Sequence, residues 1–192
     1  SASSFQAFYD PTFWLLGALF SASLIALRLV PAWISLYASD VFYVGWNYER
    51  DAAVVAGGVI GVLYTTGHIF GSPLLGKISD WLFRIGVQRI LIPTICLGLG
   101  ALVVTFFLFT IPPPWLLGLV SLLLGIVLHA FPIMNAVVAE KWGVTFTGQS
   151  LGGINMIGQI VGALALSVSG YVGMAFSMGA VDPLSEYRGI WY

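Results

Sequence analysis

Two long stretches of the sequence, residues 52–76 and 90–139, contain no Lys, Arg, Asp or Glu. Only 8% of all residues are charged and 59% are hydrophobic, whereas soluble domains average about 25% charged residues. So few charges cannot cover a water-facing surface, and lipid is therefore the expected solvent for most of the chain. The net charge of −1 gives no reason to expect nucleic acid as a partner.

Five segments are long and apolar enough to cross a membrane core of about 30 Å, which takes about 20 residues of helix. Strands are excluded because these runs are too long and do not alternate with a period of two. The sequence predicts an all-α, polytopic transmembrane helix bundle, in a piece of a longer chain. The five expected spans, and the start of a sixth, are residues 13–37, 52–75, 90–111, 115–139, 148–176 and 189–192.

The segment 76–90 separates the two uncharged stretches, and we expect it to form a short loop between two spans. It carries four charged residues, Lys77, Asp80, Arg84 and Arg89. Such a concentration of charge in so apolar a chain marks a connection that lies in water.

Basic residues also predict the orientation of the spans, because Lys and Arg are enriched in cytoplasmic loops. The 76–90 segment and the link that holds Lys141 carry four basic residues together, against Arg50 and Arg188 in the links at the opposite ends. We therefore expect the 76–90 segment, the link that holds Lys141 and the N-terminus of the segment to face the cytoplasm. The predicted location is a multi-pass integral protein of a bacterial-type inner (plasma) membrane.

Arg28 is the only charged residue deep inside an expected span. An intramembrane Arg costs about 3 kcal/mol on insertion scales, and such residues commonly mark functional sites. The planar guanidinium group matches the geometry of carboxylate and phosphate groups. We interpret Arg28 as a contact for an anionic substrate. Snorkelling to the interface, or pairing with a carboxylate elsewhere in a longer chain, are the alternatives.

The fifth expected span is rich in small residues and also carries two amides. Asn155 and Gln159 are four residues apart, so they lie on one stripe of a helix. Amides are costly in lipid, and this stripe should therefore face protein or a water-filled cavity. The spacing of the glycines favours close packing against a neighbouring helix; the pairs are Gly148 with Gly152 and Gly158 with Gly162.

The two histidines, His68 and His129, lie in the second and fourth spans. Each could relay protons near neutral pH, or could be a hydrogen-bonded packing residue. His129 is the stronger candidate for a cavity contact, because Pro132 follows it. A proline there frees a backbone carbonyl and can kink the helix beside a cavity, and Asn135 extends the polar patch.

Motifs of known enzyme classes are missing from the sequence: there is no HExxH, P-loop, GxGxxG or serine-hydrolase elbow. The single cysteine, Cys96, permits no disulfide framework and no thiolate metal site. The sequence therefore predicts a protein that is not an enzyme and that has no cofactor and no metal site.

The segment 76–90 resembles the signature loop of the major facilitator superfamily. In that family a Gly is followed after three residues by an Asp, and then by basic residues around a second Gly. In the common form a basic residue comes directly after the Asp, whereas here three residues intervene. This form is more similar to the second copy of the loop, in the C-terminal half of such transporters. The matching positions are Gly76, Asp80, Arg84, Gly86 and Arg89.

Two further stretches agree with this resemblance. Residues 139–164 resemble the link and the glycine-rich fifth helix of a facilitator half. Residues 13–37 are similar to the first helix of the second half in the organophosphate/organic-anion branch, which includes the glycerol-3-phosphate transporter. That helix carries an Arg followed by Trp and Tyr, matched here by Arg28, Trp33 and Tyr37.

The resemblance implies the C-terminal six-helix half of a secondary transporter, with the N-terminal half as the alternative. It implies alternating access, with the substrate site between two halves. The expected substrate is a small organic anion, moved with protons or by anion exchange. The other expected partners are the lipid bilayer and the missing N-terminal half. The predicted substrate contacts are Arg28, Tyr37, His129, Asn155 and Gln159.

The signature loop has a second implied role, as a gate. In the family, the loop Asp and Arg make a charge contact with helix ends that holds the outward-open state. Asp80 and Arg84 would take this role here, with support from Arg89. A non-transporting membrane receptor or assembly module on the same scaffold, and an intramembrane enzyme, are the alternative functions.

Overall fold

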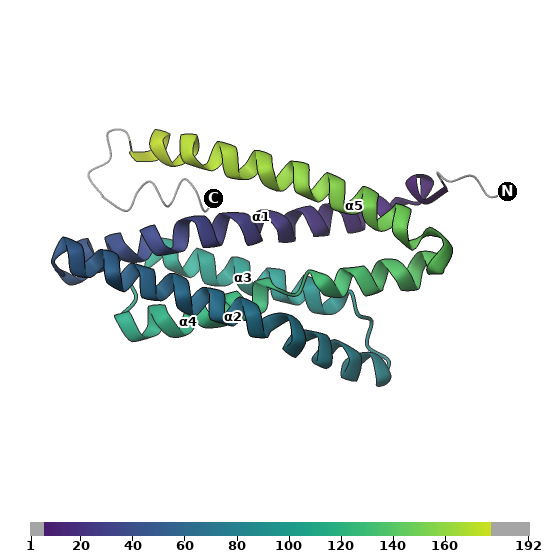
Figure 1. The fold of residues 1–192 in the computed structure, drawn as a ribbon, viewed down its shortest axis with the longest axis horizontal. Coiled ribbons are helices and arrows are strands. Elements are labelled where there is room, and N and C mark those ends of the chain that lie inside the picture. The colour runs from purple at the N-terminus through teal and green to yellow at the C-terminus, as the bar shows by residue number, and fades with distance from the viewer. Residues whose placement is uncertain (1–5, 178–192) are drawn as a thin grey trace.

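The computed structural model of the protein describes residues 6–177, which form an all-α bundle (Figure 1). The expected sixth span and the segment that precedes it lie outside the described residues. A short 3₁₀ helix precedes the first long helix, and a π-helical turn follows it. The elements are η1 (Gln6–Tyr9), α1 (Pro11–Asp40), η2 (Val41–Gly45), α2 (Arg50–Arg84), α3 (Leu91–Phe109), α4 (Pro114–Leu128) and α5 (Pro132–Ser177).

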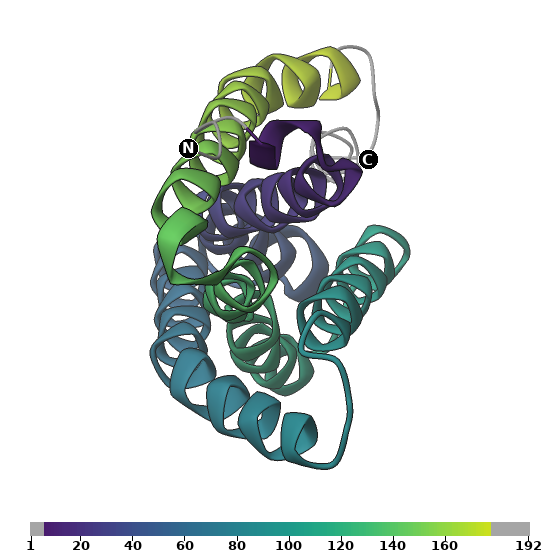
Figure 2. The same ribbon diagram turned by 90° about the vertical axis from the view of Figure 1, so that its right-hand side faces the viewer.

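The helices pack around three clusters of buried apolar side chains. Helix α1 lies between α5 and α2, α2 packs along α4, and α3 packs mainly against α4 at the side of the bundle (Figure 2). Large apolar side chains cover much of the exterior, among them Leu15, Val55, Ile69 and Leu102. An apolar exterior requires an apolar solvent. Among the described residues, four helical segments are long and apolar enough to span a membrane. These are Pro11–Gly45, Arg50–Arg84, Pro114–Gly143 and Phe146–Ala175, and α3 is a shorter apolar helix.

The closest approach of two helices is between α2 and α4, and it depends on glycines that the sequence analysis did not single out. A Cβ atom at Gly71 of α2 would lie 2.6 Å from the carbonyl oxygen of Ile126. A Cβ atom at Gly125 of α4 would lie 2.9 Å from the backbone nitrogen of His68. Only glycine permits such contacts, and small residues at helix crossings are the usual means of close packing in membranes.

The expectation of a loop over residues 76–90 is wrong for its first part, because α2 continues through Arg84. The segment from Gly76 to Arg84 contains no strong helix breaker, and helical packing therefore extends beyond the apolar span. The helix ends where Gly86 adopts φ of 91°. The Gly86 amide donates to the Phe83 carbonyl (3.1 Å) and the Val87 amide to Leu82 (3.0 Å), which is the Schellman pattern of a glycine-terminated helix.

The expected fourth span, 115–139, is interrupted rather than continuous. Helix α4 ends at Leu128, and a turn at His129–Phe131 separates it from α5, which begins at Pro132. Proline favours the first position of a helix, which explains the new start. Helix α5 then bends sharply at Gly143, whose φ of 66° and ψ of 175° are not helical.

The connections alternate between the two ends of the bundle. Trp46, after η2, donates its indole N–H to the carbonyl of Pro112 (3.2 Å), which joins the α1–α2 and α3–α4 connections. At the other end, ion pairs join the α2–α3 loop and the start of α1 to the region just before Gly143. The observed alternation agrees with the predicted topology within residues 6–177.

Candidate functional site

Arg28 is half-buried on α1 and points towards α5, where its guanidinium group donates a hydrogen bond to Oε1 of Gln159. The two residues are far apart in the sequence and come together because α1 packs along α5. The structure thus brings together two of the predicted substrate contacts.

Glycines on α5 make room for the Arg28 side chain. A Cβ atom at Gly162 would lie 3.1 Å from Cδ and 3.4 Å from Nε of Arg28. At Gly158, one turn earlier, a Cβ atom would lie 2.8 Å from Cδ1 of Phe20 and 2.9 Å from Cδ1 of Leu24. The glycine pair predicted to permit close packing therefore faces α1 and lets the guanidinium group reach its amide partner.

A line of polar side chains continues from Arg28 along α5. Gln159 donates through Nε2 to Oδ1 of Asn155, at 3.4 Å, and both amide side chains are exposed at the bundle surface. Within residues 6–177 the guanidinium group of Arg28 has no carboxylate partner. The positive charge is thus held in place by a neutral amide, and an anion can still approach it.

Tyr37 lies apart from this line, although it was predicted as a substrate contact. It is nine residues from Arg28 on α1, about 13 Å along the helix axis. Its side chain is 2% exposed and its hydroxyl donates to the backbone carbonyl of Phe107, at 3.0 Å. Trp33 likewise joins α1 to α5, because its indole N–H donates to Ser169 Oγ at 3.1 Å. Both contacts hold helices together.

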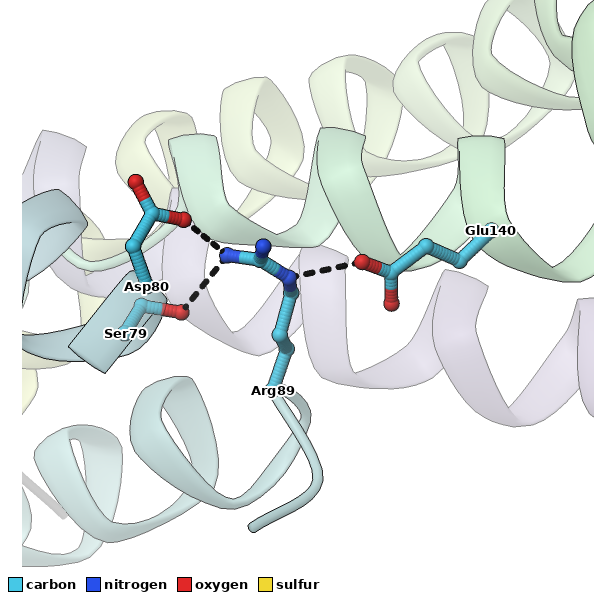
Figure 3. A network of polar contacts seen from close by, with 4 residues as sticks. All are labelled: Ser79, Asp80, Arg89 and Glu140. Atoms are coloured by element: carbon cyan, nitrogen blue, oxygen red, sulfur yellow. Dashed lines mark hydrogen bonds and ion pairs between the residues drawn. The ribbon is translucent and has the colours of Figure 1, made fainter. Parts of the chain in front are cut away.

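The charged signature segment forms a compact network around Arg89, which follows α2 (Figure 3). The guanidinium group of Arg89 donates to Asp80 and, at 2.6 Å, to Oε1 of Glu140 on α5. It also donates to Oγ of the buried Ser79 at 3.4 Å and lies 4.4 Å from the centre of the Phe83 ring. One cation thus ties the end of α2 to α5.

The electrostatics of this network favour the charged form of Arg89. Its hydrogen bond to Asp80, followed by that to Glu140, raises the pKa of the Arg89 guanidinium group above its ordinary value. Arg84, which was predicted to share the gating role with Asp80, is exposed on the last turn of α2 and makes no ion pair with the described residues. Gly76 lies within α2, and Gly86 ends it.

A further ion pair lies at the same end of the bundle. Asp10 caps α1, where its Oδ1 accepts a hydrogen bond from the Thr12 amide at 2.8 Å, and its Oδ2 lies 3.6 Å from Nζ of Lys141. The hydrogen bonds with Thr12, and then the charge of Lys141, lower the pKa of the Asp10 carboxyl group. The start of α1 is thereby tied to α5, next to the Arg89 network.

His129 lies away from Arg28, at the C-terminal end of α4, and stacks on His68 of α2 with ring centroids 3.8 Å apart. The structure therefore separates the predicted substrate contacts into three places. Arg28, Gln159 and Asn155 form one line between α1 and α5. Tyr37 and His129 each lie elsewhere.

A comparison with protein families identifies the family to which the chain belongs. A family model described as Major Facilitator Superfamily matches residues 2–166. The chain belongs to the major facilitator superfamily. No curated protein and no solved structure gave a match. Membership makes this facilitator a multi-pass membrane protein of a family of transporters rather than enzymes, and it confirms the resemblance at the level of the superfamily.

Sequence reasoning missed several contacts of the facilitator. Glu140 was not assigned a role, although its position beside Lys141 and shortly before Gly143 placed it in a charged link. The pairing of His68 with His129 had no signal in the sequence, because the two lie on different helices and no spacing relates them. Asp10 was also not assigned a role, although the Pro that follows it is a signal for the start of a helix.

Proposed function

We propose that the protein is one six-helix half of a secondary transporter that moves a small organic anion by alternating access. The remaining half would complete the substrate cavity. Arg28 would bind the negative charge of the substrate, as in the organophosphate/organic-anion branch that the first helix resembles. Gln159 and Asn155 would add neutral hydrogen-bonding groups to the same anion site.

The arrangement of Arg28 and Gln159 is the observation that carries this proposal. A guanidinium group inside a span is costly unless it is paired or used, and here its partner is a neutral amide rather than a carboxylate. Gln159 fixes the direction of the guanidinium group without neutralising it. An incoming carboxylate or phosphate can then accept charge-assisted hydrogen bonds from Arg28, which are about twice as strong as neutral ones.

A cavity of about 430 Å³ between α1 and α2 supports the proposal that the substrate is a small solute. Its lining includes Pro31 and Ser35 of α1 with Thr65 and Thr66 of α2. Pro31 and Ser35 lie three and seven residues after Arg28, on the same face of α1. An anion bound at Arg28 could therefore extend its uncharged part towards hydroxyl groups in this cavity.

The Arg89 network would serve as the gate of the transporter. It connects α2 and α5, and the Asp10–Lys141 pair connects α1 and α5 at the same end. These contacts would hold that end closed in one state and would break in the other. Arg89, rather than Arg84, would be the basic residue of this gate, and its partner would be Asp80. The bound anion would exchange for another anion or move with protons.

Reconstitution of the full-length protein into lipid vesicles tests the proposal. We expect uptake of labelled organic carboxylates or organophosphates, and binding of the same anions in detergent. Arg28→Ala should lower anion affinity by at least tenfold, and Arg28→Lys should recover only part of it because a lysine cannot offer a planar fork. Gln159→Ala should have a smaller effect, about threefold to tenfold for one hydrogen bond.

Arg50→Ala provides a matched control, because Arg50 lies at the start of α2, over the ring of Tyr43, and far from Arg28 in the sequence. Its anion affinity should equal that of the wild type. Normal binding by Arg28→Ala would refute the anion site. Anion binding without any flux would favour the receptor or assembly module over a transporter.

A further inference from the structure

The two histidines of the described chain form a stacked pair between α2 and α4. The rings of His68 and His129 have centroids 3.8 Å apart and planes inclined by 38°. Imidazole is the side chain whose charge changes most readily near neutral pH. Two imidazole groups this close can hold one positive charge between them, whereas a second charge would be repelled by the first.

His129 occupies the end of a broken helix. It is the C-terminal capping residue of α4, and the chain turns there before α5 begins at Pro132. The last carbonyl groups of a helix carry partial negative charge, which favours a nearby cation. Half-helix C-terminal ends inside transporters are known places for coupling cations. The end of α4 therefore attracts a proton to His129, whereas burial of the ring opposes the charge.

One nitrogen of the pair has no protein partner. Nδ1 of His129 is buried and lacks a hydrogen-bond partner in the described part of the chain. A buried polar nitrogen without a partner is destabilising, and each such group in a folded protein calls for an explanation. This nitrogen is available to a proton or to a water molecule that delivers one.

The pair lies at the closest helix crossing of the bundle. Gly67 precedes His68 on α2, and Gly125 lies one turn before His129 on α4. A Cβ atom at Gly125 would lie 2.9 Å from the backbone nitrogen of His68. A change of charge on either ring therefore acts on a contact that has no room to adjust without moving a helix.

We propose that His68 and His129 together form a binding site for a single proton, and that this proton is the coupling ion of the transporter. The coupling role rests on the transport function proposed above, whereas the proton site does not. Protonation of one ring places a cation at the end of α4. Loss of that proton restores the neutral stack and changes the attraction between α2 and α4.

Among the side chains around the pair, the two imidazole groups are the ones whose charge changes. Helix α2 contributes the Tyr64 ring, 6.4 Å from that of His68, and α3 contributes Cys96 in the cluster beside Ala130. On the α1 side Phe131 follows His129 and meets Phe20. No Asp, Glu, Lys or Arg side chain of the described residues has an electrostatic effect on either imidazole ring.

Nuclear magnetic resonance of the full-length protein in lipid nanodiscs, with ¹⁵N-labelled histidine, tests the proton site directly. The resonances are assigned with His68→Gln and His129→Gln. Between about pH 8 and pH 5 we expect the wild-type pair to take up one proton, each single variant one, and the double variant none. Uptake of two protons, or of none, by the wild-type pair overturns the site.

Proton movement during transport tests the coupling role. In vesicles that take up a labelled organic anion, a pH-sensitive dye should report proton flux with the wild type. In the double variant, which combines His68→Gln and His129→Gln, the proton flux should fall at least tenfold while anion exchange continues. Ser121→Ala, at a fully buried residue of α4, is the control and should leave titration and proton flux unchanged.

The outcomes separate the two proposals. Absence of anion uptake by the wild type refutes the transport function, while a one-proton titration still supports the site. Anion uptake with unchanged proton flux in the double variant overturns the coupling role. An equal loss of proton flux in Ser121→Ala also overturns it, because disturbed packing at the crossing would then be the cause.

Discussion

Glu140 and Lys141 are consecutive residues, yet their charged groups bind different parts of the bundle. Oε1 of Glu140 accepts a hydrogen bond from Arg89 after α2, at 2.6 Å, whereas Nζ of Lys141 lies 3.6 Å from Asp10 at the start of α1. Two adjacent side chains thus connect three elements at one end of the protein.

Replacement of Arg89 by Gln should weaken this end of the bundle. Arg89→Gln removes both carboxylate contacts while it keeps a polar side chain of similar length. Because these pairs are partly exposed, we expect a loss of about 1 kcal/mol, roughly a fivefold change in the equilibrium between the two open states. Anion exchange rates and the accessibility of a cysteine label at the network would both report it.

Arg84→Gln is the matched control for Arg89→Gln. Arg84 lies on the same charged segment but is exposed and lacks an ion pair among the described residues. The control should leave the exchange rate within about twofold of the wild type, as expected for an isolated exposed charge. A larger effect of Arg84→Gln than of Arg89→Gln would contradict the assignment of Arg89 as the partner of Asp80.

Substitutions on α5 should separate packing from anion binding. A Cβ atom in Gly158→Ala meets the apolar rings and branches of Phe20 and Leu24, so we expect destabilisation of about 1–3 kcal/mol. In Gly162→Ala the Cβ atom meets the flexible Arg28 side chain instead. It should therefore lower anion affinity more than stability. Thermal unfolding in detergent and anion binding measure the two effects.

Gly170→Ala on the same helix serves as the control, because nothing lies within 4 Å of the added Cβ atom. Stability should then stay the same or rise slightly, since alanine favours a helix over glycine by about 1 kcal/mol. Equal destabilisation by Gly158→Ala and Gly170→Ala would show that the α1–α5 contact is looser than the structure has it.

The α2–α4 crossing should be the part of the fold least tolerant of added volume. In Gly71→Ala the Cβ atom would lie 2.6 Å from a backbone oxygen, which cannot move aside as a side chain can. We expect a loss of about 1–3 kcal/mol or more, seen as a lower unfolding temperature. Gly76→Ala, one turn later in α2 and with open space around it, should have no such effect.

Tyr37→Phe distinguishes a packing role from a substrate role. The substitution removes the hydroxyl that donates to the Phe107 carbonyl and leaves this acceptor without its donor. We expect a loss of about 1 kcal/mol in stability and no change in anion affinity. A drop in affinity with unchanged stability would instead favour the prediction, made from the sequence, that Tyr37 contacts the substrate.

Asp10 should stabilise the start of α1 in a manner that depends on pH. Its pKa is lowered in the folded protein, chiefly by Thr12, so the carboxylate stabilises the fold at pH values above its ordinary pKa of 3.8. This stabilisation is lost as the pH falls through the lowered pKa. Asp10→Ala should unfold at a lower temperature than Asp10→Asn, because asparagine still caps the helix.

Much of the fold could be predicted because lipid imposes simple rules. Long uncharged runs such as 90–139 must be helical in a membrane, and successive spans place their connections at alternate ends. The orientation that the basic residues indicate stays a prediction. Arg28 stood out because a charge inside a span is rare. Of the two glycine pairs predicted to pack closely, Gly158 and Gly162 do face α1, whereas Gly148 and Gly152 have open space around them.

Other features depend on tertiary contacts that no sequence spacing reveals. The end of α2 at Arg84 follows from Gly86, a local signal, but the charges before it suggested a loop. The meeting of Arg89 with Glu140 depends on the fold of α5 back across the bundle. The stacking of His68 on His129 depends on how α2 crosses α4, and the glycines of that crossing lie on helices whose composition is otherwise unremarkable.

The two breaks in the region of α4 and α5 have a mechanical consequence. Residues 132–142 form a helical arm, about 16 Å long, between the turn at His129–Phe131 and the bend at Gly143. The arm begins beside the histidine pair and ends with Glu140 and Lys141. If the proposed proton site tilts this arm at its first end, the tilt would displace the side chains of Glu140 and Lys141 at its other end.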